Sequence, residues 1–304
     1  MLQYHPTPVQ EITDHPSCKK AGIRLLVKRE DLNHPAVSGN KWWKLKYNLE
    51  SAAKENHRTI LTFGGAFSNH IYATAAAARE LNFRSIGIIR GEETMPLNPT
   101  LSFAQINGMQ IHYADRSAYR QKSVPEFTEA LHAKFGEFFL IPEGGSNLLA
   151  VKGCAEFAEQ HLFEIDFDHL VLAVGTGGTM AGLVSAFQGG KKIVGISVLK
   201  NGDFLKEDIA ALITRFAGTS YPNWSLLTGY HGGGYAKSTP ELLCFIREMK
   251  NQYGIPLDHV YTGKLLFAVI REIEAGAFQR GSTVLALHSG GLQGNADSTI
   301  NRSP

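Results

Sequence analysis

The stretch AVGTGGTMAG, residues 173–182, is the first candidate for chemistry in this sequence. Three of its glycines, Gly175, Gly177 and Gly178, lie close together at its centre. Glycine lets a backbone come close to a ligand, and Thr176 and Thr179 add hydroxyl groups where a helix would begin. Because backbone N–H groups at a helix N-terminus attract anions, the natural guest of this loop is a phosphate group. The alternative is a purely structural turn between a strand and a helix.

Two common nucleotide-binding patterns do not fit this loop. Counted from Gly175, the sixth position of a GxGxxG fingerprint is Met180. The next apolar run, KIVGISV, leads into Leu199 and Lys200 and offers no acidic residue for a ribose. No GK[ST] follows the glycines, which also excludes a Walker loop. The loop therefore favours a phosphate that is not part of a dinucleotide.

A second candidate is TFGGAFSNHIYATAAAARE, residues 62–80. Its glycine pair can form a turn, Ser68 or Asn69 can cap the helix that follows, and the alanines allow close packing behind it. Read by itself, the stretch favours a capped and buried helix that has His70 in its first turn.

Two further turns carry polar side chains. In DHVYTGKLLFAVIRE, residues 258–272, Tyr261 and Thr262 precede an amphipathic helix, and in VLALHSGGLQG, residues 284–294, a strand ends at His288 and Ser289. Taken singly, both are ordinary polar turns. All four stretches nevertheless place polar groups where a strand meets a turn or a helix, and ligands of open α/β sheets bind at such strand ends.

The elements that would position these turns follow from the apolar pattern. Six short runs rich in β-branched residues occupy 23–27, 59–63, 85–90, 169–174, 192–198 and 282–288. Helical patterns lie between them at 41–56, 68–82, 178–188, 240–254 and 264–276. Continuous apolar runs that alternate with helices predict parallel strands covered on both faces. We therefore expect the α/β class, with two lobes, one of them formed by residues of about 50–150.

Composition excludes several other classes. The 304 residues carry a formal charge of +2 and no basic run interleaved with aromatics, so nucleic-acid binding is not expected. The three cysteines are far apart and no spaced His/Cys cluster indicates a metal, which favours a reducing, cytoplasmic setting. The N-terminus lacks the continuous apolar core of a signal peptide, and the uncharged run at 170–187 is better explained as a strand, a glycine loop and a helix than as a membrane span.

Read together, the motifs resemble those of pyridoxal-phosphate enzymes with the tryptophan-synthase β-subunit fold, specifically the group of 1-aminocyclopropane-1-carboxylate deaminase and D-cysteine desulfhydrase. The motifs are, in order, SGNKWWKL, GGAFSNH, GTGGTMAGL, YTGK and HSGG. The resemblance implies a two-domain fold type II enzyme, in which each domain is an open, twisted, mostly parallel sheet flanked by helices. Residues 1–49 and 151–304 would form the large cofactor-binding domain, and 50–150 the small domain.

The resemblance implies that pyridoxal 5'-phosphate is the cofactor and that Lys41 binds it covalently. A lysine must be partly deprotonated to condense with an aldehyde, and apolar surroundings lower its pKa. Trp42 and Trp43, directly beside Lys41, would supply such surroundings. The alternative is a helix lysine that merely lies beside core aromatics.

The other site residues follow from the same resemblance. The cofactor phosphate would be held by Gly175, Thr176, Gly177, Gly178 and Thr179. Asn69 matches the asparagine that hydrogen-bonds the phenolic oxygen of the cofactor ring. Ser68 and Tyr261 match residues close to the reacting atoms and, with Lys41, are the predicted catalytic residues. Substrate would contact Ser68, Asn69, His70 and Tyr261, and a helix N-terminus suits its carboxylate.

Two positions separate the subgroups of the family. Deaminases resemble one another in a glutamate after the YTGK-type tyrosine and a leucine in the HxGG turn, whereas desulfhydrases have a small hydroxyl residue at each. Here these cofactor-contacting positions are Thr262 and Ser289. A carboxylate beside the ring nitrogen favours the protonated pyridinium, and a neutral hydroxyl does so less. Because elimination of a thiol needs a weaker electron sink than opening of a cyclopropane, the pair favours a desulfhydrase.

Two departures from the family pattern concern the substrate. Phe67 stands where glutamine is common, and Trp43 where arginine is common. We expect Phe67 to make the carboxylate end of the pocket less polar, and Trp43 to mark a difference in pocket shape.

The resulting prediction is a lyase that converts D-cysteine to pyruvate, ammonia and sulfide. The alternatives are a 1-aminocyclopropane-1-carboxylate deaminase, a β-eliminase or racemase of another small amino acid, and a non-catalytic protein that binds the cofactor. A homodimer is implied by the resemblance, with a small amino acid as ligand and neither nucleic acid nor membrane as partner.

Overall fold

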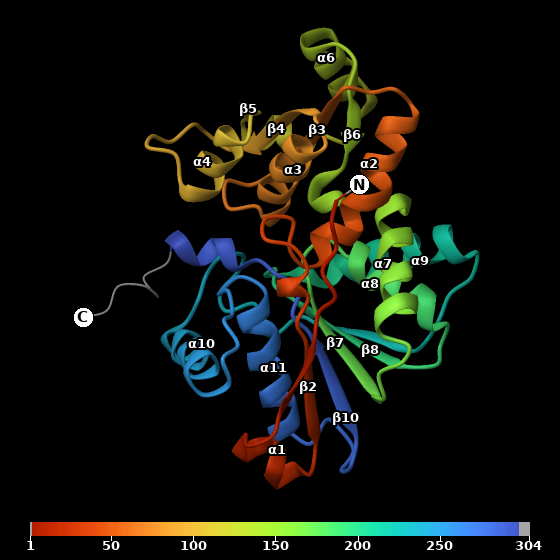
Figure 1. Ribbon diagram of the computed structural model, residues 1–304, viewed down its shortest axis with the longest axis vertical. Coiled ribbons are helices and arrows are strands. Elements are labelled where there is room, and N and C mark those ends of the chain that lie inside the picture. Colours follow the sequence, from red (N-terminus) through yellow and green to blue (C-terminus); the bar gives the residue numbers. More distant parts are fainter. Residues whose placement is uncertain (1, 298–304) are drawn as a thin grey trace.

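The computed structural model describes residues 2–297 and contains two β-sheets, each flanked by helices. Figure 1 shows the four-stranded sheet in the upper part of the molecule and the six-stranded sheet in the lower part. This arrangement confirms the predicted α/β class with its two mostly parallel sheets.

The larger sheet combines both ends of the chain. Its strand order is β1 (Val9–Ile12), β2 (Arg24–Lys28), β10 (Thr283–Leu287), β7 (His169–Val174), β8 (Lys192–Ser197) and β9 (Trp224–Leu227). Every neighbouring pair is parallel except β1 with β2. Parallel neighbours bring their carboxyl ends to one edge, so the turns after β7 and β10 emerge side by side.

The smaller sheet is wholly parallel. Its order is β5 (Met109–Ala114), β4 (Arg84–Arg90), β3 (Thr59–Gly64) and β6 (Phe139–Ile141). All of its strands lie within 59–141, which agrees with a small domain of residues 50–150. The exact division into domains stays a proposal.

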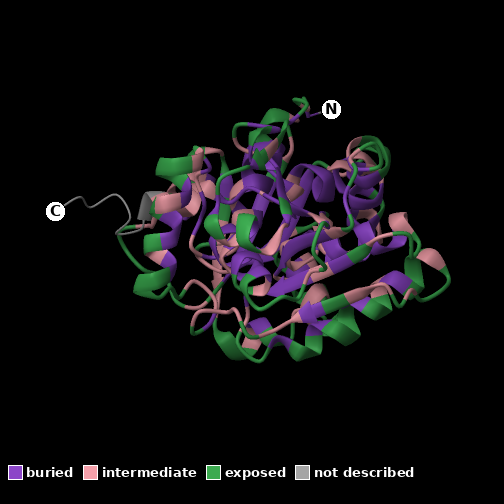
Figure 2. Ribbon diagram, turned by 90° about the horizontal axis from the view of Figure 1, so that it is seen from below, coloured by how far each residue is buried: buried purple, intermediate pink, exposed green. Residues whose placement is uncertain are grey.

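Helices cover both faces of the larger sheet. The α-helices of the described chain are α1 (Pro16–Ala21), α2 (Asn40–Lys54), α3 (Asn69–Glu80), α4 (Pro99–Ile106), α5 (Arg116–Arg120), α6 (Pro125–Phe135), α7 (Leu148–His161), α8 (Gly178–Phe187), α9 (Leu205–Ala217), α10 (Pro240–Tyr253) and α11 (Thr262–Glu274). Alternate residues of β7 and β10 belong to different cores: Leu172 and Leu285 pack with α2, α7, α8 and α9, whereas Val171 and Val284 pack with α1, α10 and α11. Figure 2 shows the buried residues on the sheets and the inner helix faces.

The strands and helices predicted by range are present, but the YTGK turn does not follow a strand as predicted, because residues 254–261 form an irregular link between α10 and α11. All six apolar runs form strands, and the five helical patterns form α2, α3, α8, α10 and α11. The uncharged run at 170–187 is β7, a glycine turn and α8, as expected. Within residues 2–297, none of the helices has both the length and the apolarity needed to cross a bilayer.

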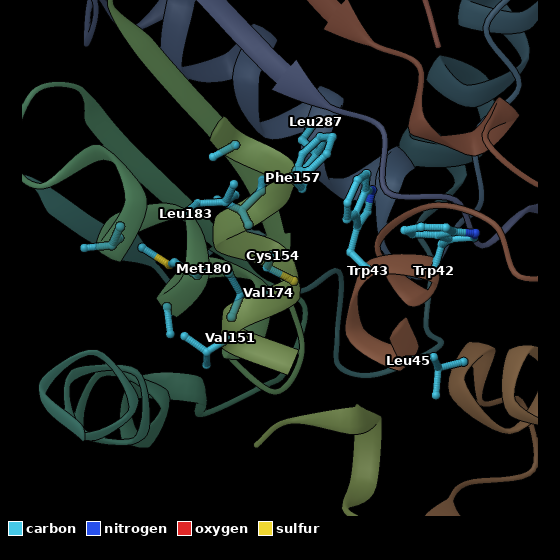
Figure 3. Packing of buried hydrophobic residues seen from close by; sticks show 14 of the residues in the cluster. Trp42, Trp43, Leu45, Val151, Cys154, Phe157, Val174, Met180, Leu183 and Leu287 are labelled. Atoms are coloured by element: carbon cyan, nitrogen blue, oxygen red, sulfur yellow. The ribbon is translucent and has the colours of Figure 1, made fainter. Parts of the chain in front are cut away.

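Helix α2 is anchored to the core by its two tryptophans, which are 5% and 2% exposed. Figure 3 shows Trp43 directed toward Phe157 of α7, and the two ring centroids are 5.4 Å apart. Its indole Nε1 donates to the buried carboxylate of Glu30 at 3.1 Å, while Trp42 Nε1 donates to the Gln3 carbonyl at 3.1 Å. These contacts fix the rotation of α2 and therefore the direction of its other faces.

Candidate active site

A cavity of about 680 Å³ lies at the carboxyl ends of the strands, where the turns of both sheets meet. Of the residues predicted for the site, ten line it: Lys41, Ser68, Asn69, His70, Gly175, Thr176, Gly177, Thr179, Tyr261 and Ser289. Gly178 and Thr262 are not among the lining residues, but each is adjacent in sequence to residues that are. The tertiary structure thus brings all five motifs together.

Two motifs meet backbone to backbone at the cavity floor. The Asn40 amide, at the start of α2, donates to the Ser289 carbonyl at 3.3 Å. The preceding Gly39 has φ +68°, and a Cβ there would lie 1.9 Å from the Ser289 oxygen. Only glycine is compatible with this contact, so the glycine of SGNK is needed for its approach to the HSGG turn.

Two lysines of α2 face the cavity. Lys41 and Lys44 are three residues apart and therefore share one helix face. Burial and, to a smaller extent, repulsion from Lys44 lower the pKa of Lys41 to about 7. Burial also lowers the pKa of Lys44 to about 8. A substantial fraction of Lys41 is therefore unprotonated, and so nucleophilic, at neutral pH.

The tryptophans do not supply the surroundings of Lys41, contrary to our interpretation of the sequence. A helix turns about 100° per residue, so Trp42 and Trp43 point away from the face that carries Lys41. Neither tryptophan lines the cavity. The prediction that Trp43 alters the pocket is therefore wrong, because its ring belongs to the core between α2 and α7.

Phe67 also differs from expectation. Its side chain is 44% exposed and is not among the residues that line the cavity. It lies in the turn between β3 and α3, at the surface. The expected loss of polarity at the carboxylate end of the pocket is not supported.

The glycine loop after β7 has groups that are suited to bind an anion. The first N–H groups of α8 have no acceptors within their own helix. Lys44 Nζ donates to Ser146 Oγ at 2.9 Å and to Thr176 Oγ1 at 3.4 Å, which places a cation beside the loop. A Cβ at Gly178 would lie 2.8 Å from Ser146 Oγ, so the missing side chain makes room for this group of donors.

Asn40 joins the glycine loop to the reactive lysine. Its Oδ1 accepts from Lys41 Nζ at 2.7 Å, and its Nδ2 donates to Thr179 Oγ1 at 2.8 Å. One amide therefore links the amine of Lys41 to the glycine loop.

Ser68 is the N-cap of α3, as the sequence allowed. Its Oγ accepts from the amides of His70 at 3.2 Å and Ile71 at 3.3 Å. Because both contacts use the oxygen as acceptor, the hydroxyl proton remains available as a donor on the cavity side.

His70 is buried behind Ser68 in a defined tautomer. Thr62 Oγ1 donates its proton to the Ile141 carbonyl at 2.8 Å, so the 2.8 Å contact with His70 must use an Nε2 proton. Nδ1 is then unprotonated, and it is buried without a partner among the described residues. Burial, Lys44 and Lys41 all lower the pKa of His70 well below its usual range, so the ring is neutral.

Tyr261 lies beside the glycine loop, where a Cβ at Gly175 would be 3.1 Å from its ring. Burial raises its pKa far above the ordinary value, and the phenol of Tyr235 raises it further. The two rings are 6.1 Å apart and both line the cavity. Tyr261 is therefore a proton donor and not a base at neutral pH.

Thr262 and Ser289 have different surroundings. The Thr262 hydroxyl donates to Asp258 Oδ1 at 2.6 Å and accepts from the Asp258 amide at 3.0 Å, so its hydrogen-bonding capacity is used behind the cavity wall. Ser289 lines the cavity directly. Of the two subgroup positions, only Ser289 lines the cavity.

The comparisons with known proteins agree with this geometry. Residues 1–290 match the family model described as pyridoxal-phosphate dependent enzyme. The chain belongs to this family. Its cofactor is pyridoxal 5'-phosphate, and the two-sheet architecture is the type II fold of these enzymes.

Relatives and solved structures cover almost the whole chain. A Pyrococcus horikoshii protein, provisionally named 1-aminocyclopropane-1-carboxylate deaminase, is 31% identical over 95% of this chain and 90% of its own length. The Arabidopsis thaliana "Bifunctional D-cysteine desulfhydrase/1-aminocyclopropane-1-carboxylate deaminase, mitochondrial" is 31% identical over 97% of this chain and 79% of its own. A crystal structure described as an "ACC deaminase homologue" superposes with a TM-score of 0.82, at 30% identity over 97% and 92% of the two chains.

The residues of this pyridoxal-phosphate dependent enzyme fit its cofactor. Helix amides, the Thr176 and Thr179 hydroxyls and Lys44 form a donor set for a phosphate, and Lys41 is a deprotonatable amine linked to that set by Asn40. Electrostatics and hydrogen-bonding capacity thus match an anionic aldehyde at this place.

Several residues of the site escaped sequence reasoning: Asn40, Lys44, Ser146 and Tyr235. Lys44 could have been found, because on a helix it shares the face of Lys41. Asn40 lies within SGNK, but nothing in its type distinguishes a bridging amide from a cap. Ser146 and Tyr235 come from loops whose positions depend on the tertiary fold.

Proposed function

We propose that this enzyme is a D-cysteine desulfhydrase, which releases pyruvate, ammonia and hydrogen sulfide by α,β-elimination. The α C–H bond and the β C–S bond break, the sulfur leaves with the electron pair, and one water molecule hydrolyses the remaining enamine to pyruvate and ammonia. When bound, the cofactor supplies the electron sink that stabilises negative charge at the α-carbon.

Lys41 is the proposed base for the α-proton. Its pKa of about 7 leaves a large neutral fraction at physiological pH. Tyr261 is unsuited to that role because its pKa is raised far above 10, but its hydroxyl can donate to the substrate or to the leaving sulfur. The free proton of Ser68, together with the start of α3, suits the substrate carboxylate.

The presence of Ser289 in the cavity lining is the main observation in favour of a desulfhydrase. Ser289 lines the cavity and has a neutral hydroxyl at the position where deaminases resemble one another in having leucine. Thr262, at the glutamate position, keeps its neutral hydroxyl bonded to Asp258. Neither position offers a carboxylate to a ring nitrogen, which supports the reaction that needs the weaker electron sink.

The test is a product assay on the purified holoenzyme with D-cysteine, L-cysteine and 1-aminocyclopropane-1-carboxylate. We expect pyruvate and sulfide from D-cysteine, and none above background from a Lys41→Ala control. If D-cysteine yields no pyruvate above that control, the proposal is wrong.

A deaminase is the second candidate, because the names of the Pyrococcus and Arabidopsis relatives include this activity. It would release 2-oxobutanoate from 1-aminocyclopropane-1-carboxylate, so the same assay separates the two reactions. Another small amino acid as substrate remains the third alternative, although Phe67 no longer supports it.

We also propose a homodimer in the cytoplasm, from the family resemblance and the cysteine content. Light scattering of the purified enzyme would measure its oligomeric state, and fractionation of the source cells its location.

A further inference from the structure

The C-terminal 3₁₀ helix η4 (Leu292–Asp297) reaches from the larger sheet to the first residue of α3. Gln293 Nε2 donates to Asn69 Oδ1 at 2.6 Å. Asn69 lines the cavity, whereas Gln293 is not among the described residues that line it. Gln293 therefore contacts Asn69 from behind, outside the space that a ligand would fill.

Gln293 is held in place by its neighbours along the chain. The Gly294 amide donates to the Gly291 carbonyl at 3.2 Å, and Asn295 Nδ2 donates to the Leu257 carbonyl at 2.9 Å. These two bonds tie η4 to the HSGG turn and to the segment that leads into α11. The Gln293 side chain is thus presented to Asn69 from a braced backbone.

The bond decides which end of the Asn69 amide is free. An amide has an acceptor end and a donor end, and a donor bound at Oδ1 leaves Nδ2 for other partners. Asn69 Nδ2 lies against the HSGG turn, because a Cβ at Gly291 would be 2.6 Å from it. Asp258 Oδ1 would be 3.3 Å from the same Cβ, and this carboxylate favours the NH₂ end of the amide on that side.

We infer that Gln293 is a positioning residue for the cofactor: it fixes the Asn69 amide so that its NH₂ group, and not its carbonyl, is available to the phenolic oxygen of pyridoxal phosphate. The inference rests on the role proposed for Asn69 and is independent of which amino acid is the substrate. A phenolate oxygen only accepts, so a reversed amide would oppose two acceptors.

The substitution Gln293→Glu replaces the donor that binds Asn69 with an acceptor of almost the same shape. Its carboxylate only accepts, so it would bind Asn69 Nδ2 and turn Oδ1 toward the cofactor. Methionine, of similar length, neither donates to nor strongly competes for the amide, so Asn69 would become free to rotate. Gln293→Glu should therefore weaken cofactor binding more than Gln293→Met does, relative to wild type.

The experiment is a titration of the cofactor-free proteins with pyridoxal 5'-phosphate, combined with visible spectra of the saturated holoproteins. We expect Gln293→Glu to weaken cofactor binding about tenfold or more and to shift the visible absorption band, and Gln293→Met to weaken binding about threefold. Gln279→Glu adds the same charge at an exposed position and should behave as wild type. Melting temperatures of all variants report whether each protein is folded.

The variant Asn69→Ala distinguishes the positioning role of Gln293 from the cofactor-binding role proposed for Asn69. If Asn69→Ala weakens binding but Gln293→Glu leaves affinity and spectrum unchanged, Gln293 has no positioning role and the inference is wrong. If Asn69→Ala itself binds the cofactor as wild type does, the role of Asn69 fails and the inference fails with it. Neither result bears on the D-cysteine assay.

Discussion

The two faces of α2 differ in almost every physical respect although their residues are neighbours in sequence. One face presents Lys41 and Lys44 to the cavity, where burial lowers both lysine pKa values. The other presents Trp42 and Trp43 to the core. Because the helix turns about 100° per residue, one turn of KWWK directs its two lysines to the cavity and its two tryptophans to the core. The difference teaches that proximity in sequence is not proximity in the site.

Lys41→Ala should have the largest effect on the cavity face. We expect kcat/KM to fall by about 10²–10⁴-fold, with loss of the visible cofactor band, because the nucleophile and the proposed base disappear together. Urea denaturation should show no loss of stability, since a desolvated amine is removed. Lys54→Ala, an exposed lysine of the same helix, is the matched control. A destabilised Lys41→Ala protein would contradict the division between the faces.

Trp43→Ala, on the core face, should lower the stability of the protein and leave the pKa of Lys41 unchanged. We expect the free energy of unfolding to fall by about 3–5 kcal/mol, because a large cavity opens against α7 and Glu30 loses a donor. The pH at which half of Lys41 is unprotonated should stay near 7. It can be measured from the rate at which cofactor-free protein incorporates pyridoxal phosphate at each pH. A changed midpoint would mean that the two faces are coupled.

Lys44→Met tests whether Lys44, on the cavity face, both binds the cofactor and lowers the pKa of Lys41. Loss of a charged donor beside the glycine loop should weaken cofactor binding about tenfold or more. Lys44 repulsion helps to lower the pKa of Lys41, so its removal should move the pH midpoint of cofactor incorporation upward. Titration and incorporation rates measure the two effects, with Lys54→Met as control. A midpoint that moves downward would show that another group sets the Lys41 pKa.

The smallest expected effect is a pH dependence of stability in the cofactor-free protein. The pKa of Lys41 is about 7 when folded, against 10.5 for an ordinary lysine, so between these values the unfolded chain binds more protons. The contribution of Lys41 to the free energy of unfolding should therefore rise from pH 7 toward pH 9. Urea midpoints measured at each pH should rise less steeply for Lys41→Met. Parallel curves for the two proteins would mean that Lys41 is not desolvated.

The strands show where sequence reasoning succeeded and where it failed. The six predicted strands, β2, β3, β4, β7, β8 and β10, are all interior strands. The four missed strands, β1, β5, β6 and β9, are all edge strands. Interior parallel strands are buried on both faces and leave continuous apolar runs, whereas edge strands are short or partly exposed and leave none.

The site divides in a similar way. The five motifs predicted ten residues that line the cavity. Eight of them follow the carboxyl ends of β3, β7 and β10, where ligands of parallel sheets bind, whereas Lys41 and Tyr261 lie at the starts of α2 and α11. Trp43 and Phe67 were assigned to the pocket from their positions in motifs, and both lie elsewhere. A motif gives the order of residues but not the rotation of the helix or the path of the loop that carries them.

By itself the sequence determined the α/β class and the interior strands, since both leave a local signal in residue type and spacing. The cofactor and the prediction for Lys41 came from the resemblance of five ordered motifs to a known family, and the family match supports the cofactor. Only the tertiary structure decided the direction of Trp43, the bond between Thr262 and Asp258, and the contact of Gln293 with Asn69 across 224 residues. Helix rotation and long-range hydrogen bonds depend on how elements pack against one another, and packing is a property of the whole chain.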